Sequence, residues 1–191
     1  MTDGRKIVAR QETKRTPGEF LGDLKRLIKE AIDLGTGLDG ARLVEVLHVV
    51  GKAFAVQPDE IAILVVFQGR FLKFLIPAKL QSIGQIPLTS ATSLAARTAR
   101  ERKPELINHF TAVPHASVFE AVPLFDQRGD PIQKIMSAPF ILDGKSIGVI
   151  QVSRKSKTVA TAGPDFTPQN LRDLVAFAGA LAPCIPLFVA D

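Results

Sequence analysis

The 191-residue chain contains one cysteine, two methionines, and neither tryptophan nor tyrosine. The single cysteine, Cys184, excludes an internal disulfide, a zinc site built from several cysteines and a two-cysteine redox cycle. Long apolar runs are also lacking, because each is interrupted well before the ~18 residues that a membrane-spanning helix needs. The first residues show neither the apolar core nor the cleavage motif of a secretory signal. We therefore expect a cytoplasmic protein with no membrane span.

Positive charge is concentrated at the N-terminus. The formal net charge is +5, and residues 1–16 contain five basic residues against two acidic ones. Such a basic segment can interact weakly with nucleic acid or anionic lipid. A solvated, disordered tail over residues 1–15 is the simpler interpretation. No basic stretch alternates with aromatic residues that could stack on bases, so we expect no specific nucleic-acid binding.

The stretch 132–154 gives the strongest structural signal in the chain. Asp143-Gly144 lies between two apolar runs, Ile135–Leu142 and Ser146–Val152. An Asp-Gly pair favours the type I′ turn of a two-residue hairpin, because both central positions of that turn need positive φ. Both runs are apolar at odd and even positions, which predicts a central hairpin covered on both faces. Gly148, inside a strand, predicts the close approach of another segment.

The periodicity of the remaining chain predicts an α+β fold. In chain order we expect helices beginning at Thr16 and Asp39, strands at Ile61–Phe67 and Phe71–Ile76, a short helix within 89–102 capped by Ser90 or Thr92, a strand at Glu105–Phe110, the hairpin, and a helix beginning at Thr167. Strands joined by two-residue turns are antiparallel. The terminal helices should cover one face of the sheet, and the short helix and loops 105–131 the other. A small-molecule pocket would lie beneath those loops.

Five short motifs in this order resemble the GAF domain family. They are Ile86-Pro87-Leu88, Arg102–Asn108, Ser137–Phe140, Asp143–Val152 and Phe166–Leu171. The resemblance covers about residues 17–182. It implies a GAF-like, PAS-related fold with a central antiparallel sheet of about six strands, in a single domain over residues 16–191. It also implies a module that senses a small ligand or dimerises through its terminal helices, and that regulates an output domain.

Segments and residues outside these motifs exclude some functional classes of the GAF family. No kinase, cyclase, phosphodiesterase or helix-turn-helix segment is found, so we expect the module to act through a separate signalling partner. Bilin-binding members and free-methionine-sulfoxide reductases use cysteines that this chain lacks near the pocket. The Asn-Lys-Phe-Asp-Glu set of cyclic-nucleotide-binding members is not present as a set. Haem-binding members use a pocket histidine, and this possibility stays open.

Three residues of the loop region are candidate ligand contacts: His109, His115 and Glu120. Two histidines and a glutamate could ligate a metal ion, yet their spacings of six and five residues match no helical ligand motif. Histidines that hydrogen-bond the loop backbone are the simpler alternative. Contact with an anionic or polar ligand is the third. We expect no metal site, and the sequence names no cofactor.

Lys134, Ser137 and Arg97 complete the candidate ligand-binding set. A lysine in an apolar strand lies either at the fraying end of the strand or opposite a carboxylate or phosphate in a pocket. Arg97 and Arg100 share one face of the short helix. That face is usually solvated, although one arginine could reach an acidic ligand. The chain has neither a nucleophile elbow nor a phosphate-binding loop, so no residue is predicted to be catalytic.

The sequence thus predicts a non-enzymatic small-ligand sensor or binding module in signalling or regulation, acting as a homodimer. The alternative is a ligand-free dimerisation or interaction module with a filled core. Four apolar residues expected at an exposed C-terminal end favour the alternative, because such patches usually meet a partner: Ile185, Leu187, Phe188 and Val189. A redox or metal-dependent enzyme is a third hypothesis, which the lone distal cysteine disfavours.

Overall fold

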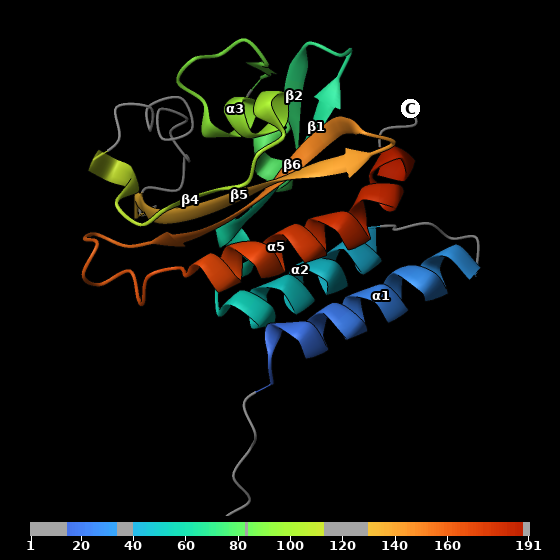
Figure 1. Ribbon diagram of the computed structural model, residues 1–191, viewed down its shortest axis with the longest axis horizontal. Helices are drawn as coiled ribbons and strands as arrows, with labels where there is room; N and C mark the ends of the chain where they lie inside the picture. Colours follow the sequence, from blue (N-terminus) through green and yellow to red (C-terminus); the bar gives the residue numbers. More distant parts are fainter. Residues whose placement is uncertain (1–14, 34–39, 83, 113–129, 189–191) are drawn as a thin grey trace, which may run out of the picture.

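The computed structural model describes residues 15–33, 40–82, 84–112 and 130–188, and these form an antiparallel sheet between two helical layers (Figure 1). The strands are β1 (Ile61–Phe67), β2 (Phe71–Ile76), β3 (Ile86–Pro87), β4 (Glu105–Ile107), β5 (Ile132–Leu142) and β6 (Lys145–Lys155). Their spatial order is β3-β2-β1-β6-β5-β4. The predicted α+β fold with six antiparallel strands is therefore confirmed.

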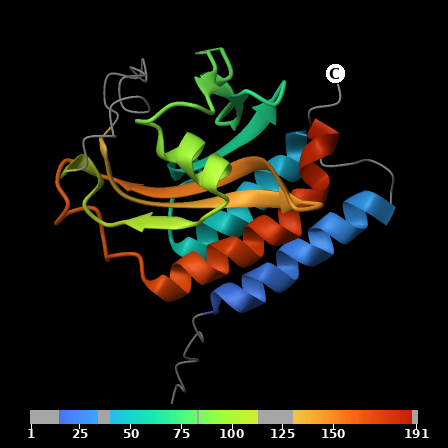
Figure 2. The ribbon, with the colours of Figure 1, turned by 45° about the horizontal axis from the view of Figure 1, so that its top comes forward.

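Three long helices cover one face of this sheet. They are α1 (Pro17–Asp33), α2 (Gly40–Phe54) and α5 (Pro168–Leu181), and the 3-10 helix η4 (Ala182–Phe188) continues α5. The short helix α3 (Leu94–Glu101) lies on the opposite face. Figures 1 and 2 show α1, α2 and α5 side by side below the sheet and α3 above it. Helices from the two ends of the sequence thus share one layer, as the sequence predicts.

The β5–β6 hairpin forms at the predicted turn. Asp143 and Gly144 have φ values of 49° and 73°, the left-handed conformation that a type I′ turn requires at both positions. The strands are longer than predicted and pair from Ile132↔Lys155 to Leu142↔Lys145. Side chains of both parities are buried along β5 and the middle of β6 because both faces are covered.

The sheet divides the apolar core into two parts. Ile61, Ile63 and Val65 of β1 pack with side chains of α1, α2 and α5 in the larger part. Ala62 and Leu64, which point the other way, pack with the alanines of α3. The period-2 geometry of one central strand therefore supplies both cores.

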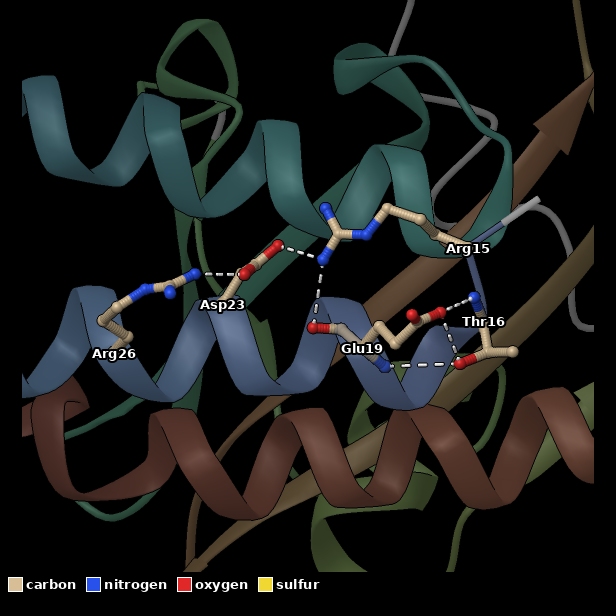
Figure 3. Close-up of polar contacts among 5 residues, drawn as sticks. All are labelled: Arg15, Thr16, Glu19, Asp23 and Arg26. Carbon is tan, nitrogen blue, oxygen red and sulfur yellow. Dashed lines mark hydrogen bonds and ion pairs between the residues drawn. The ribbon is translucent and has the colours of Figure 1, made fainter. Parts of the chain in front are cut away.

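Helix α1 begins directly after Thr16, as predicted, and a capping box forms there. Thr16 N donates to Glu19 Oε2 at 2.6 Å, and Glu19 N donates to Thr16 Oγ1 at 3.4 Å (Figure 3). The hydrogen bond from the Thr16 backbone is the main cause that lowers the pKa of Glu19. Asp23 binds Arg15 and Arg26 in the same stretch. These contacts are exposed, so they define where the helix starts more than they stabilise the fold.

Two predicted boundaries are wrong. Helix α3 is capped by Ser93, whose side chain accepts a hydrogen bond from Ala96 N at 3.2 Å, and not by Ser90 or Thr92. The side chains of Ser90 and Thr92 bond each other at 3.4 Å instead. The strand predicted at Glu105–Phe110 ends at Ile107.

The chain ends also differ from expectation. Ile185 is only 2 % exposed, because η4 folds it into the larger core, so the prediction that it forms an exposed end is wrong. The side chains of Leu187 and Phe188, together with Val189, lie outside the described residues, as do Asp39 and all of the expected tail except Arg15. Within the described ranges, no helix has the length and apolarity needed to span a bilayer.

Gly148 provides a direct test of the packing at the centre of the sheet. A Cβ at this position would lie 2.3 Å from Leu64 O, and this carbonyl belongs to the paired backbone of β1. We expect Gly148→Ala to lower the free energy of unfolding by about 3 kcal/mol, measured by urea denaturation. The control is Gly22→Ala in α1, where a Cβ would meet nothing within 4 Å. This substitution should raise the free energy of unfolding by about 0.5–1 kcal/mol, because alanine favours a helix more than glycine does. Equal effects of the two substitutions would contradict this account.

Candidate functional site

The sheet face beneath α3 carries a group of buried polar side chains. Ser137 on β5 and Gln151 on β6 lie opposite each other in the ladder, and Gln151 Nε2 donates to Ser137 Oγ at 3.3 Å. Thr98 of α3 is also buried. All three side chains are at most 3 % exposed. They form the candidate site, which we call the α3-face polar group.

Local sequence explains why these side chains are buried. Helix α3 presents Ala95, Ala96 and Ala99 to the sheet, and these small residues allow a close approach over β5 and β6. Thr98 belongs to the same buried stripe. Apolar side chains surround the polar group on this face, including Val149 and Ile135. Polar atoms are therefore held in surroundings that exclude water.

Two atoms of this group have unused hydrogen-bonding capacity. Among the described residues, Gln151 Oε1 and Thr98 Oγ1 are buried and have no hydrogen-bond partner. A buried polar group without a partner costs about 1–3 kcal/mol. A molecule that offered an N–H or O–H group there would recover this free energy. The three side chains carry no charge, so they suit a neutral binding partner.

An ion pair borders the polar group. Arg97 Nε and Nη2 donate to Glu105 Oε1 and Oε2 at 2.7 and 2.6 Å, and Glu105 pairs with Ser137 across β4 and β5. The hydrogen bonds to Glu105 raise the pKa of Arg97. The structure thus places Arg97 beside Ser137, but its guanidinium already has an internal carboxylate partner.

Lys134 lies on the opposite face of β5. It has the parity of Met136 and Ala138, which pack toward the long helices. Its Nζ lies 2.6 Å from Gly163 O and 2.7 Å from Asp165 Oδ1, while the whole residue is 4 % exposed. Lys134 therefore contacts a carboxylate, but this carboxylate belongs to Asp165 of the chain itself.

His109 lies near Lys134 and Asp165, and away from Ser137. It is exposed, and its charge contributes to lowering the pKa of Asp165. Its neighbour Asn108 donates to Phe166 O at 3.0 Å and accepts from Phe166 N at 2.9 Å. These contacts connect β4 and β5 to the segment that leads into α5.

The other predicted contacts, His115 and Glu120, lie outside the described residues. The predicted set therefore separates into Ser137 with Arg97 on the α3 face and Lys134 with His109 near α5. Within the described part of the chain, no cluster of three or more histidine, cysteine or acidic side chains could hold a metal ion.

Sequence reasoning missed Gln151 and Thr98. Gln151 is a polar residue inside the apolar run of a strand expected to be buried on both faces. That combination is a usable signal, because a buried amide needs partners. Thr98 gave no comparable signal, since a threonine on a short helix is ordinary on a solvated face.

No protein-family model and no curated protein sequence matches this chain. Solved structures do. The GAF domain from Acinetobacter phosphoenolpyruvate-protein phosphotransferase aligns with a TM-score of 0.62 at 16 % identity, over 90 % of this chain and 93 % of that one. The corresponding GAF domain from Coxiella burnetii gives a TM-score of 0.64 at 13 % identity, over 90 % and 96 %.

An enzyme also matches. Free methionine-R-sulfoxide reductase from Neisseria meningitidis, solved in complex with its substrate, has a TM-score of 0.59 at 17 % identity, over 91 % of this chain and 90 % of that one. At these identities the likeness shows the fold alone. The chain has a GAF-like fold, as the resemblance of its motifs implied, and proteins with this fold include an enzyme.

The pair formed by Lys134 and Asp165 predicts a pH effect. The hydrogen bond from Lys134 lowers the pKa of Asp165 from its ordinary value of 3.8. A carboxyl group with a lowered pKa stabilises the fold above its unfolded pKa, and this contribution is lost as the pH falls through the folded pKa. We expect Asp165→Asn to be less stable than wild type near neutral pH, and the difference to shrink below about pH 4.

Urea denaturation at a series of pH values measures this difference. The control is Glu45→Gln, which removes an exposed carboxylate of α2 that has no ion pair within the described ranges. A stability difference between Asp165→Asn and wild type that stays constant down to acid pH would contradict the prediction.

Proposed function

We propose that this chain is a non-enzymatic sensor or binding module of GAF type. It takes a small ligand between α3 and the sheet and acts in signalling or regulation as a homodimer, with residues 16–191 as its single domain. One observation carries the proposal: among the described residues, Gln151 Oε1 on β6 and Thr98 Oγ1 on α3 are buried without hydrogen-bond partners, and the Gln151 amide contacts the hydroxyl of Ser137.

The polar group also suggests the chemistry of the ligand. Gln151 offers a carbonyl oxygen, and the two hydroxyls of Ser137 and Thr98 can donate or accept. A charged ligand would lose hydration here without gaining an opposite charge, because Arg97 is already paired with Glu105. The ligand we propose is therefore neutral and largely apolar, with at least one N–H or O–H group.

We assign Lys134 and His109 a structural role and not a role in ligand binding. Lys134 and His109 belong to contacts that hold the start of α5, and both have surroundings distinct from the α3 face. His115 and Glu120 stay candidate ligand contacts on the strength of the sequence alone.

The proposal of a non-enzymatic module draws on the state of the only thiol. Cys184 is buried, and burial raises the pKa of its thiol. A thiol in such surroundings is a poor nucleophile, since the thiolate is the reactive form. This distinguishes the chain from redox enzymes that rely on accessible cysteines.

The helical layer supports the proposed homodimer. Among the described residues, the large apolar side chains that stay exposed include one on each long helix: Ile32 of α1 at 56 %, Val44 of α2 at 64 % and Val175 of α5 at 41 %. Each long helix thus has an exposed apolar side chain that a second copy of the chain could cover. The same layer would serve the alternative function, a ligand-free dimerisation module with a filled core.

The ligand-binding proposal is tested by removing the polar group. We expect some neutral amides or nucleobases, screened by thermal shift, to raise the melting temperature of the wild type. The double variant Ser137→Ala with Gln151→Leu should lose this rise. Its own stability should change little, because a hydrogen bond and an unpaired acceptor are removed together.

The matched control is Ser153→Ala, which removes another buried hydroxyl of β6, one that donates to Glu60 O at 3.0 Å. It should keep the ligand-induced rise. A compound that stabilises the double variant as much as the wild type would remove Ser137 and Gln151 from the site, and a screen without any stabilising compound would favour the ligand-free alternative.

The homodimer is tested by charging its proposed surface. We expect Ile32→Lys with Val44→Lys to convert a dimer into a folded monomer, because a buried ammonium in an apolar interface is unfavourable. Static light scattering at micromolar concentration measures the mass. Ile141→Lys is the control, since Ile141 is an exposed apolar residue of β5, outside the helical layer. A wild-type monomer, or a double variant that stays dimeric, would contradict the proposal.

A further inference from the structure

The charge of this protein is distributed unequally along the chain. Residues 61–104, which comprise β1, β2, β3 and α3, contain seven basic residues and one acidic residue. Residues 15–54, which comprise α1 and α2, contain six of each sign. The stretch 61–104 therefore has an excess of six positive charges, which the helices α1 and α2 do not share.

Five basic side chains converge at one end of the sheet. Arg70 occupies the β1–β2 turn, Lys145 follows the β5–β6 turn, and three residues lie at the end of α3: Arg100, Arg102 and Lys103. All five are exposed. We call this surface the basic end.

Hydrogen bonds bring these separate segments together. Leu88 links two of them, because its N donates to Arg70 O at 2.8 Å and its O accepts from Arg100 Nη1 at 2.8 Å. Arg102 Nη1 donates to Gly144 O at 3.1 Å, next to Lys145. The basic end is thus a property of the fold and not of one run of sequence.

Two arginines of this surface are held in place without being neutralised. Arg100 also donates to Ser90 O at 3.3 Å, so Arg100 and Arg102 are both fixed by backbone carbonyls. A carbonyl orients a guanidinium, leaves its full charge and occupies only part of its five N–H donors. Arg97 on the same helix differs from these two arginines, because its guanidinium is already paired with the carboxylate of Glu105.

The nearby acidic side chains neutralise this charge only weakly. Glu101 lies 3.6 Å from Arg100, and both side chains are more than 40 % exposed. Exposed pairs of this kind contribute little. Asp143 is exposed in the β5–β6 turn. Ordered arginines with spare donors suit carboxylates, which bind guanidinium groups through two parallel hydrogen bonds.

We propose that the basic end docks an acidic segment of a partner protein. The arginines are already oriented, so binding costs less side-chain entropy than it would for mobile lysines. The carboxylates of Asp143 and Glu101 stand among the basic groups and would repel the uniform charge of a nucleic-acid backbone. An acidic peptide can place a neutral or basic residue opposite them. This surface is separate from the α3-face polar group and does not depend on a ligand there.

Fluorescence anisotropy with a labelled peptide in which aspartate and glutamate residues alternate with serine tests the proposal, at low and at physiological ionic strength. The variant Arg100→Glu with Arg102→Glu should weaken binding by at least tenfold. The matched control, Lys79→Glu with Lys157→Glu, changes the net charge equally at exposed lysines remote from the basic end and should weaken binding by less than threefold. The variant Arg100→Lys with Arg102→Lys keeps the positive charge but cannot make two parallel hydrogen bonds to a carboxylate. Its affinity for the peptide should lie between those of the wild type and the glutamate variant.

Three results would overturn the proposal. Equal losses in the two charge-reversed variants would show attraction by net charge alone. Tighter binding of labelled single-stranded oligothymidine than of the peptide would indicate a nucleic-acid surface. Failure of the wild type to bind the peptide at low ionic strength would leave the basic end without its proposed partner. Thermal melting of each variant verifies that the protein remains folded during the measurement.

Discussion

Burial of the central strands on both faces is the constraint on which the rest of this structure depends. β1, β5 and β6 carry apolar side chains of both parities, so each face must be covered. The long helices cover one face and the alanine-rich α3 the other. At the centre of this sheet a Cβ on Gly148 would lie 2.3 Å from Leu64 O, so the backbone of β1 leaves no room for a side chain there. Water is thereby excluded from both sides, and every polar side chain on these strands needs a partner supplied by the protein or by a ligand.

The polar side chains of the sheet meet that need in two ways. On the face of the long helices, Lys134 is satisfied by Asp165 and Gly163 O, and Asn108 binds Phe166 at two points. On the α3 face, Gln151 and Ser137 satisfy each other only in part. This asymmetry connects structure to the proposed function, because one group completes the fold and the other leaves capacity for a binding partner.

The features that sequence predicted well are those encoded locally. The Asp-Gly turn, the helix starts at Thr16 and Thr167, and the two-sided strands each depend on a few adjacent residues. The cap of α3 was missed because the run 89–93 offers several polar candidates within one turn. The partner of Lys134 lies about thirty residues further along the chain, and the burial of Ile185 depends on how the chain end packs. Neither can be obtained from local patterns. The same holds for the site, since Gln151 could be recognised as unusual while its pairing with Ser137 needed the register of the hairpin.

Native mass spectrometry of freshly purified protein tests the central claim, a small ligand held beneath α3, most directly. The account predicts a dimer that carries additional mass of a small neutral molecule, released on denaturation and absent from protein in which Ser137 and Gln151 are replaced by apolar residues. Additional mass that persists in that variant, or a wild-type protein without any bound molecule even after incubation with compounds that offer N–H or O–H groups, would contradict it.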